Sequence, residues 1–216
     1  MSGANLNGAP NSPPDGGIEA GAILQDIEEI DRARAQEYAV LSTLLVRSPD
    51  AALIERLTRL PGDTTPLGRA HAALGKAAAE TTADRAEREY FALFVGLGDG
   101  GLFPYASYYL TGFLQGRPLA TLRDALRLLG IERTPGHSEP EDHVAFLLAV
   151  MASLVGGLIE APAGADRAFF EGHLAPWTGR FFRDLERARS APLYASIGAL
   201  GRTFVAIEQE AFALPR

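Results

Sequence analysis

The sequence predicts an all-α fold, a single-domain bundle of roughly eight to ten helices. Leucine outnumbers valine and isoleucine combined and alanine is abundant, a composition that favours helices over strands. Apolar residues recur at steps of three and four along most of the chain, and no alternating run is long enough to predict a sheet. With 216 residues, 47% of them hydrophobic, the chain is long and apolar enough to bury one core.

The chain is expected to begin with a flexible tail, residues 1–17, followed by one all-helical domain over residues 18–216. The tail carries no lysine, arginine or apolar run, so it lacks the features of a secretory signal. A first helix is expected over residues 23–45. Its apolar residues recur at helical spacing, with one gap at Arg34: Ile23, Ile27, Ile30, Tyr38, Leu41 and Leu45.

Capping residues predict where the next helices start. Ser48-Pro49 is expected to open a second helix that ends at Pro61-Gly62, and Thr65-Pro66 to open a third. Serine and threonine cap helix starts, and proline fits the first turn. Thr81 or Thr82 is expected to cap a fourth helix. Its inward-facing residues are Ala86, Tyr90, Leu93 and Phe94.

Residues 96–107, with the sequence GLGDGGLFPYAS, interrupt the helical pattern and predict a loop. The segment contains a G-x-G-x-x-G match, but dinucleotide binding requires a strand before this motif and a helix start after it. We therefore interpret it as a connection between helices. Leucines then indicate another helix that ends at Gly130, before a loop over residues 131–138. These leucines are Leu119, Leu122, Leu126 and Leu129.

The stretch from Val144 to Ile159 is uncharged and strongly apolar. It is shorter than the roughly 18 residues that suggest a membrane span, so it predicts a buried helix and no stable membrane insertion. Two further apolar stripes predict the C-terminal helices: Trp177, Phe181, Leu185 and Ala188, then Leu193, Ile197, Leu200, Phe204, Ile207 and Ala211.

The charge balance points to the kind of partner. The chain has 20 lysines and arginines against 27 aspartates and glutamates, a net charge of −7. A negative surface repels phosphate backbones, so nucleic-acid binding is not expected, whereas a basic peptide is attracted. The absence of cysteine excludes disulfides, thiolate nucleophiles and cysteine-ligated metals. It also favours a reducing compartment, and we expect a cytoplasmic protein.

The densest polar cluster, residues 137–143 with the sequence HSEPEDH, lies immediately before the apolar helix. A serine three residues before Glu141 has the spacing of a capping box, which accounts for this glutamate without a functional role. Glu139 and His143 are four residues apart and are expected to share a helix face, with Asp142 beside them. The sequence therefore predicts a compact group of carboxylates and imidazole at the start of a buried helix.

Three uses of this cluster are open. The two carboxylates Glu139 and Asp142 can accept the guanidinium fork of a partner's arginine, a use that the net charge favours. Asp142 with His143 can act as an acid–base pair, although no nucleophile with an oriented partner lies nearby in sequence. Oxygen and imidazole ligands also suit zinc or iron. The main alternative is therefore a helical metal-dependent enzyme that uses His137, Glu139, Asp142 and His143.

Against a metal, the sequence contains neither a Glu-x-x-His pair nor a His-Glu-x-x-His motif, so we expect no cofactor. An aromatic group in and after the loop either anchors that loop or forms the wall of an apolar groove. Its members are Phe103, Tyr105, Tyr108, Tyr109 and Phe113. Trp177, the single tryptophan, is interpreted as a core residue in preference to a platform for a ligand.

Four segments together resemble motifs of the TorD/DmsD/NarJ-type redox-enzyme maturation chaperones. The similar motifs are E-P-x-D-H at residues 139–143, Y-x-x-L-F-x-G at 90–96, P-Y-x-S-x-Y at 104–109 and H-L-x-P-W at 173–177. They occur in family order, across residues 85–213. Many relatives carry glutamate at the position of Ala106, so this loop contributes less charge here.

The resemblance implies an all-helical, TorD-like cytoplasmic chaperone without catalytic activity. Such a protein binds the twin-arginine signal peptide, and often the body, of a molybdopterin-containing oxidoreductase, and prevents its export before the cofactor is inserted. It implies a peptide-binding site in which carboxylates take a guanidinium and aromatic rings line a groove for the apolar segment. The residues implied are Glu139, Pro140, Asp142, His143, Tyr105, Ser107, Tyr108 and Trp177.

The client stays open at this point. Formate dehydrogenase, favoured slightly by general likeness, a dimethyl sulfoxide or trimethylamine N-oxide reductase, and nitrate reductase all fit the resemblance. A structural subunit of an oxidoreductase complex is a further alternative. Stable co-purification with the mature, cofactor-loaded enzyme would favour such a subunit over a chaperone.

Overall fold

A computed structural model describes residues 16–96, 101–132 and 139–214. Within these ranges the chain forms ten α-helices and two short π-helical turns but no strand, which confirms the all-α prediction. A single β-bridge in these ranges joins Tyr105 to His143. No helix in the described part of the chain is both long and apolar enough to span a membrane.

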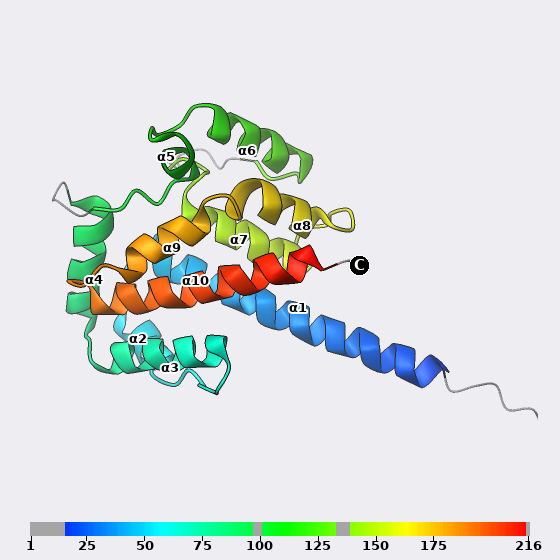
Figure 1. The fold of residues 1–216 in the computed structure, drawn as a ribbon, viewed down its shortest axis with the longest axis horizontal. Helices are drawn as coiled ribbons and strands as arrows, with labels where there is room; N and C mark the ends of the chain where they lie inside the picture. The colour runs from blue at the N-terminus through cyan, green and yellow to red at the C-terminus, as the bar shows by residue number, and fades with distance from the viewer. Residues whose placement is uncertain (1–15, 97–100, 133–138, 215–216) are drawn as a thin grey trace, which may run out of the picture.

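The elements follow one another as a series of helices of very different length. In chain order they are α1 (Gly16–Val46), α2 (Ala51–Leu57), α3 (Pro66–Ala79), α4 (Ala83–Tyr90), η1 (Phe91–Val95), α5 (Ala106–Thr111), α6 (Arg117–Leu128), α7 (Val144–Val155), α8 (Ala165–Phe169), η2 (Phe170–Leu174), α9 (Thr178–Glu186) and α10 (Pro192–Ala213). Figure 1 shows α10 across the middle of the molecule, with α2 and α3 on one side and α5 and α6 on the other.

The core lies where the long helices meet. Helix α1 packs along α7, and α10 packs along both α9 and α3. The side chains of Val144, Leu147 and Leu148 on α7 have no exposed surface, as the apolar stretch predicts. Two glycines allow α10 to approach α9 closely, because a Cβ on Gly198 or Gly201 would collide with the α9 backbone or a phenylalanine ring.

Local capping predictions are largely confirmed. The Thr65 hydroxyl accepts a hydrogen bond from the Gly68 N–H, and Thr82 caps α4 in the same way. Gly130 has a φ of +69° just after α6, the left-handed conformation expected of a residue that ends a helix. The predicted start of the second helix at Ser48-Pro49 is wrong. Asp50 caps α2 instead, because its carboxylate accepts the Leu53 N–H at 2.8 Å.

Three other expectations change. Helix α7 begins at Val144 with His143 as its N-cap, so Glu141 lies before the helix and not in its first turn. Ile30, one of the apolar residues whose spacing predicts the first helix, is 60% exposed. Helix α1 begins at Gly16, inside the segment expected as a tail. Residues 1–15, 97–100 and 133–138 lie outside the described ranges, and with them most of the tail, of the glycine motif and of the 131–138 loop.

Candidate functional site

Two of the family-like motifs, residues 104–109 and 139–143, are hydrogen-bonded to one another in a contact that we call the clasp, although Ser107 and Asp142 lie 35 positions apart in the chain. The Val144 N–H donates to the Pro104 carbonyl at 2.8 Å, and the Ala106 N–H donates to the Asp142 carbonyl at 3.0 Å. These bonds flank the antiparallel bridge between Tyr105 and His143. The start of α5 and the start of α7 are therefore held together as one unit.

Asp142 completes this clasp from the inside. It is 1% exposed, and its Oδ2 accepts the Ser107 N–H in the first turn of α5 at 2.9 Å. Tyr105, the N-cap residue of α5, has no side-chain capping bond of its own. Asp142 therefore supplies from a distant segment the carboxylate that a helix N-terminus favours. We expected Asp142 to accept an arginine of a partner. The structure differs, because a buried carboxylate is not accessible to an arginine from outside.

His143 performs a similar task for α7. Its Nδ1 accepts the Ala145 N–H at 3.1 Å, which requires that nitrogen to be unprotonated. Burial lowers the pKa of His143, and the nearby Glu139 and Asp142 only partly oppose this effect. The imidazole is therefore neutral at pH 7. Since α7 begins after His143, the expected helix face shared by Glu139 and His143 does not exist.

Glu139 is the carboxylate of the cluster that faces outward. It is exposed, and the Tyr105 hydroxyl donates to its Oε2 at 2.5 Å. Burial, together with this carboxylate, raises the pKa of Tyr105, so the phenol stays protonated and keeps donating. The Tyr105 ring also meets the His143 ring edge-on, with 5.2 Å between centroids. One glutamate is thus held in place and keeps an exposed side chain.

Beside Glu139 the structure opens into a cleft of about 960 Å³, bounded by α1, η1, α6 and α7. Its wall is largely apolar and aromatic: Val46, Tyr90, Phe94, Val95, Pro104, Leu126, Ile131, Ala145, Phe146 and Ala149. Tyr105, Pro140 and His143 line the same cleft. Tyr90 and Phe94, expected to face the core, are only half-buried. The signal that could have found them is their place in the Y-x-x-L-F-x-G motif.

The charged residues of the cleft include a pair that sequence analysis missed. Glu141 accepts the guanidinium of Arg123 on α6 through both carboxylate oxygens, with nitrogen–oxygen distances of 2.8 to 3.2 Å. Glu141 is 9% exposed and both residues line the cleft. Glu141 therefore accepts Arg123 from α6 and does not occupy the capping-box position that its spacing suggested, since it lies before α7. Ser138 lies outside the described residues.

The remaining predicted site residues do not line this cleft. Ser107 is fully buried, and its Oγ accepts the Gln115 N–H at 2.9 Å. Trp177 is 1% exposed and donates from Nε1 to the His173 carbonyl, so it is a core residue. Tyr108 is exposed and its ring lies against Phe103, but neither residue lines the cleft. The eight predicted residues thus divide into four at the cleft, three inside the protein and one elsewhere.

The metal alternative gains no support from this geometry. In the ranges that the structure describes, no three histidine or acidic side chains gather closely enough to hold a metal ion. Glu139 bonds to Tyr105 and Asp142 to Ser107, so the two carboxylates serve different neighbours. The fourth proposed ligand, His137, lies outside the described residues.

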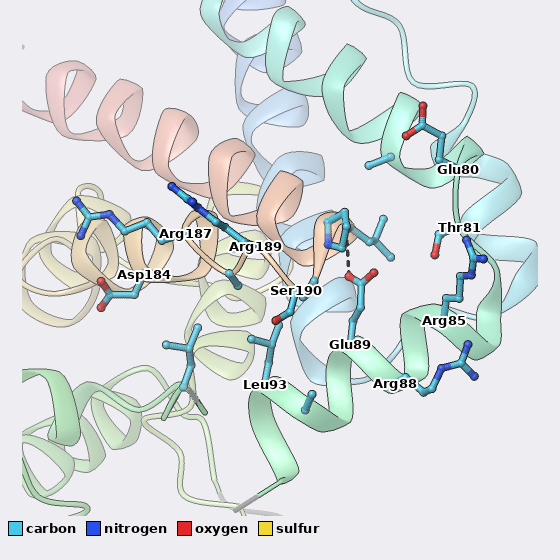
Figure 2. A pocket seen from close by; sticks show the side chains of 17 residues that line it. Glu80, Thr81, Arg85, Arg88, Glu89, Leu93, Asp184, Arg187, Arg189 and Ser190 are labelled. Atoms are coloured by element: carbon cyan, nitrogen blue, oxygen red, sulfur yellow. Dashed lines mark hydrogen bonds between the residues drawn. The ribbon is translucent and has the colours of Figure 1, made fainter. Parts of the chain in front are cut away.

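A second cavity, of about 910 Å³, lies between α4 and the turn that leads from α9 to α10 (Figure 2). Arg85 and Arg88 extend from α4 at its rim, and Arg187 and Arg189 from the turn. Inside it, Glu89 accepts the N–H groups of the first turn of α10 at 3.0 and 3.2 Å. Burial raises the pKa of Glu89, against the effect of these bonds. None of the clasped motif residues lines this cavity.

The part of the chain that the structure describes is all-helical, as the sequence resemblance implies. Residues 60–183, more than half of the chain, match the family described as "Nitrate reductase delta subunit". The chain belongs to this family, which confirms the resemblance to TorD/NarJ-type chaperones.

Individual relatives match between about half and two thirds of the chain. The chain is 27% identical over 122 residues to "Chaperone protein TorD" of Vibrio cholerae serotype O1, covering 52% of this chain and 56% of the relative. In a second strain of that serotype the identity is 30% with the same coverage. The Vibrio vulnificus protein of the same name is 28% identical over 153 residues, covering 67% and 64%. The chain thus spans little more than half the length of the Vibrio cholerae relatives.

Proposed function

We propose that this protein is a cytoplasmic chaperone for a molybdopterin-containing oxidoreductase. It binds the twin-arginine signal peptide and the apo form of that enzyme, assists cofactor insertion and prevents premature export. The observation that carries the proposal is Glu139, an exposed carboxylate held by Tyr105 at the edge of an apolar cleft. Membership of a family whose relatives are named chaperones supports it.

The cleft matches both parts of such a peptide. A twin-arginine signal carries two guanidinium groups next to an apolar segment. Glu139 offers a carboxylate for a guanidinium, and the aromatic wall with Phe94 and Phe146 offers apolar surface for the segment that follows. Tyr105, Pro140 and His143 also line the cleft. The cleft therefore offers a negative charge for the guanidinium groups of the peptide and apolar area for its apolar segment.

The buried residues of the predicted site have supporting roles in this proposal. Asp142 and Ser107 fix the start of α5 against the start of α7, and this contact positions Tyr105 and hence Glu139. Trp177 packs against Tyr109 in the core behind α5, with 5.5 Å between ring centroids. Tyr108 offers its exposed ring to the body of the client enzyme, outside the cleft.

The test is a titration of four combinations of protein and peptide. The proteins are the wild type and Glu139→Gln, and the probes are synthetic peptides with an Arg-Arg or a Lys-Lys pair before an apolar segment. Truncating a desolvated charge pair costs about 2–5 kcal/mol, but Glu139 is exposed, so we expect about tenfold weaker binding of the Arg-Arg peptide. The preference for Arg-Arg over Lys-Lys shrinks in the variant.

The matched control is Glu210→Gln, which removes an exposed carboxylate of α10 that does not line the cleft. It should bind both peptides as the wild type does. Equal affinity in all four main combinations would contradict the proposal. The client is identified separately, by mass spectrometry of proteins that co-purify from the native host, where an oxidoreductase such as formate dehydrogenase in its apo form is expected.

A further inference from the structure

We infer that the two arginines of a client bind to Glu139 and Glu141, and that Arg123 of this protein occupies the second position until a client arginine replaces it. This inference rests on the proposed function and names the groups that recognise each guanidinium. It also gives a role to the Arg123–Glu141 pair, for which neither the sequence pattern nor the capping interpretation provided one.

The cleft already contains a guanidinium in a carboxylate fork. Arg123 Nη2 lies 2.8 Å from Glu141 Oε2, and its Nε lies 3.1 and 3.2 Å from the two carboxylate oxygens. Glu141 lines the same cleft as Glu139 and is separated from it by Pro140 alone. Two carboxylates on either side of one proline therefore face a cleft that suits a peptide with two neighbouring arginines.

Asp142 cannot be the second acceptor. Its side chain is buried and its Oδ2 holds the first turn of α5. A guanidinium would have to separate the two clasped segments to reach it. The exchange at Glu141 requires no such rearrangement, because the fork that a client arginine would make has the same geometry as the fork that Arg123 makes now.

Arg123 is placed so that it can leave. Its side chain is 44% exposed, whereas that of Glu141 is 10% exposed. Among the described side chains, the Arg123 guanidinium donates hydrogen bonds only to Glu141. On exchange the Arg123 guanidinium moves into water, where it is well solvated, and Glu141 keeps an equivalent partner. Arg123 therefore acts as an internal competitor of a client arginine for Glu141.

The primary test compares Arg123→Ala with Arg117→Ala in titrations with the Arg-Arg peptide. Arg117 is an exposed arginine at the start of the same helix, α6, and does not line the cleft. Removing the competitor should tighten binding about tenfold in Arg123→Ala, and Arg117→Ala should leave the affinity unchanged. The gain should be much smaller with the Lys-Lys peptide, because an ammonium cannot reproduce the fork.

Glu141→Gln provides the second variant, which keeps the size of the side chain. It should bind the Arg-Arg peptide about tenfold more weakly than the wild type, and adding Arg123→Ala to it should restore nothing. If Arg123→Ala does not fold, Glu141→Gln alone tests the inference, and an unchanged affinity of Glu141→Gln for the Arg-Arg peptide overturns it. Ethylguanidinium is an independent probe. It should raise the melting temperature of Arg123→Ala but not of the wild type, and ethylammonium should raise neither.

The two proposals fail in different ways. A wild type that binds neither peptide overturns the proposed function. The ethylguanidinium measurement still reports whether Glu141 accepts a guanidinium in Arg123→Ala. A wild type that prefers the Arg-Arg peptide, combined with an Arg123→Ala variant of unchanged affinity, retains the proposed function and overturns the exchange.

Discussion

Two guanidinium–carboxylate forks in this protein use the same chemistry in different surroundings. Arg34 on α1 donates to both oxygens of Glu208 on α10 at 2.8 Å, and Arg123 on α6 donates to both oxygens of Glu141 beside the cleft. The side chains of the first pair are 19% and 1% exposed, and those of the second are 44% and 10% exposed. The difference in burial therefore distinguishes the Arg34–Glu208 pair, a permanent contact between helices, from the Arg123–Glu141 pair, which we infer to be exchangeable.

The surroundings add to this difference. Glu208 also accepts the Tyr38 hydroxyl at 2.7 Å, and Arg34 also donates to Asp31 at 2.7 Å and lies over the Phe212 ring. Burial lowers the pKa of Arg34, but the bonds to Glu208 and Asp31 outweigh it and raise the pKa overall. A fork with this many additional partners holds α1 to α10, whereas the Arg123 guanidinium at the cleft donates to no described side chain besides Glu141.

The largest expected effect is that of Arg34→Ala. It leaves the Glu208 carboxylate buried without its cation, so the free energy of unfolding should fall by about 3–5 kcal/mol. Urea denaturation followed by circular dichroism measures this change. Replacing both partners with apolar residues of similar size should cost much less, and a loss below about 1 kcal/mol in Arg34→Ala would contradict the role of the pair as a tie.

Arg123→Ala should have a smaller effect on stability, about 1 kcal/mol, because the half-exposed guanidinium is screened by water. The same denaturation experiment measures it. Arg59→Ala, which removes an exposed partner of Glu55 on the surface near α2, is the control and should cost less than about 0.5 kcal/mol. A loss as large as that of Arg34→Ala would show that the cleft fork is structural and not exchangeable.

A third pair has a cation that can be titrated. His71 on α3 lies 2.9 Å from Glu37 on α1, and their side chains are 19% and 11% exposed. The hydrogen bond to Glu37 raises the pKa of His71, against the effect of burial. Because the folded state binds this proton more tightly, the pair stabilises the protein below the ordinary pKa of about 6.5. That contribution is lost as the pH rises through the raised pKa.

The measurement compares the wild type with His71→Gln at about pH 5.5 and about pH 8.5. The difference in unfolding free energy should be larger at the lower pH. The pH dependence that His143 adds to stability has the opposite sign, because burial lowers its pKa and its contribution is lost as the pH falls. His143 is present in both proteins, so its contribution cancels in the comparison. A difference that does not change with pH would show that His71 contributes through packing alone.

Much of the fold follows from short-range features of the sequence. Thr65 and Thr82 cap helices because the group that each one bonds lies three residues away, so the local pattern contains both partners. The buried face of α7 follows from its uninterrupted apolar composition in the same way. The start at Ser48-Pro49 was wrong by two residues because Asp50, also a good N-cap, competes within the same short segment.

The site was only partly accessible to the same reasoning. Glu139 and Tyr105 were both singled out, but their bond joins residues 34 positions apart. Trp177 was expected in the core by its spacing and in the site by its motif, and the structure places it in the core. The Arg123–Glu141 fork escaped notice because nothing in the pattern around Arg123 distinguishes it from other arginines on exposed helix faces.

Helix content, most helix starts and the family could be recognised from the linear order of residues, because capping, periodicity and short motifs depend on near neighbours. Which carboxylate of residues 139–143 faces outward depended on tertiary packing. The clasp between the starts of α5 and α7 turns Asp142 inward and leaves Glu139 exposed, while α6 brings Arg123 to Glu141. Contacts between segments far apart in the chain decide burial, and burial decides which of several similar charges is accessible to a partner.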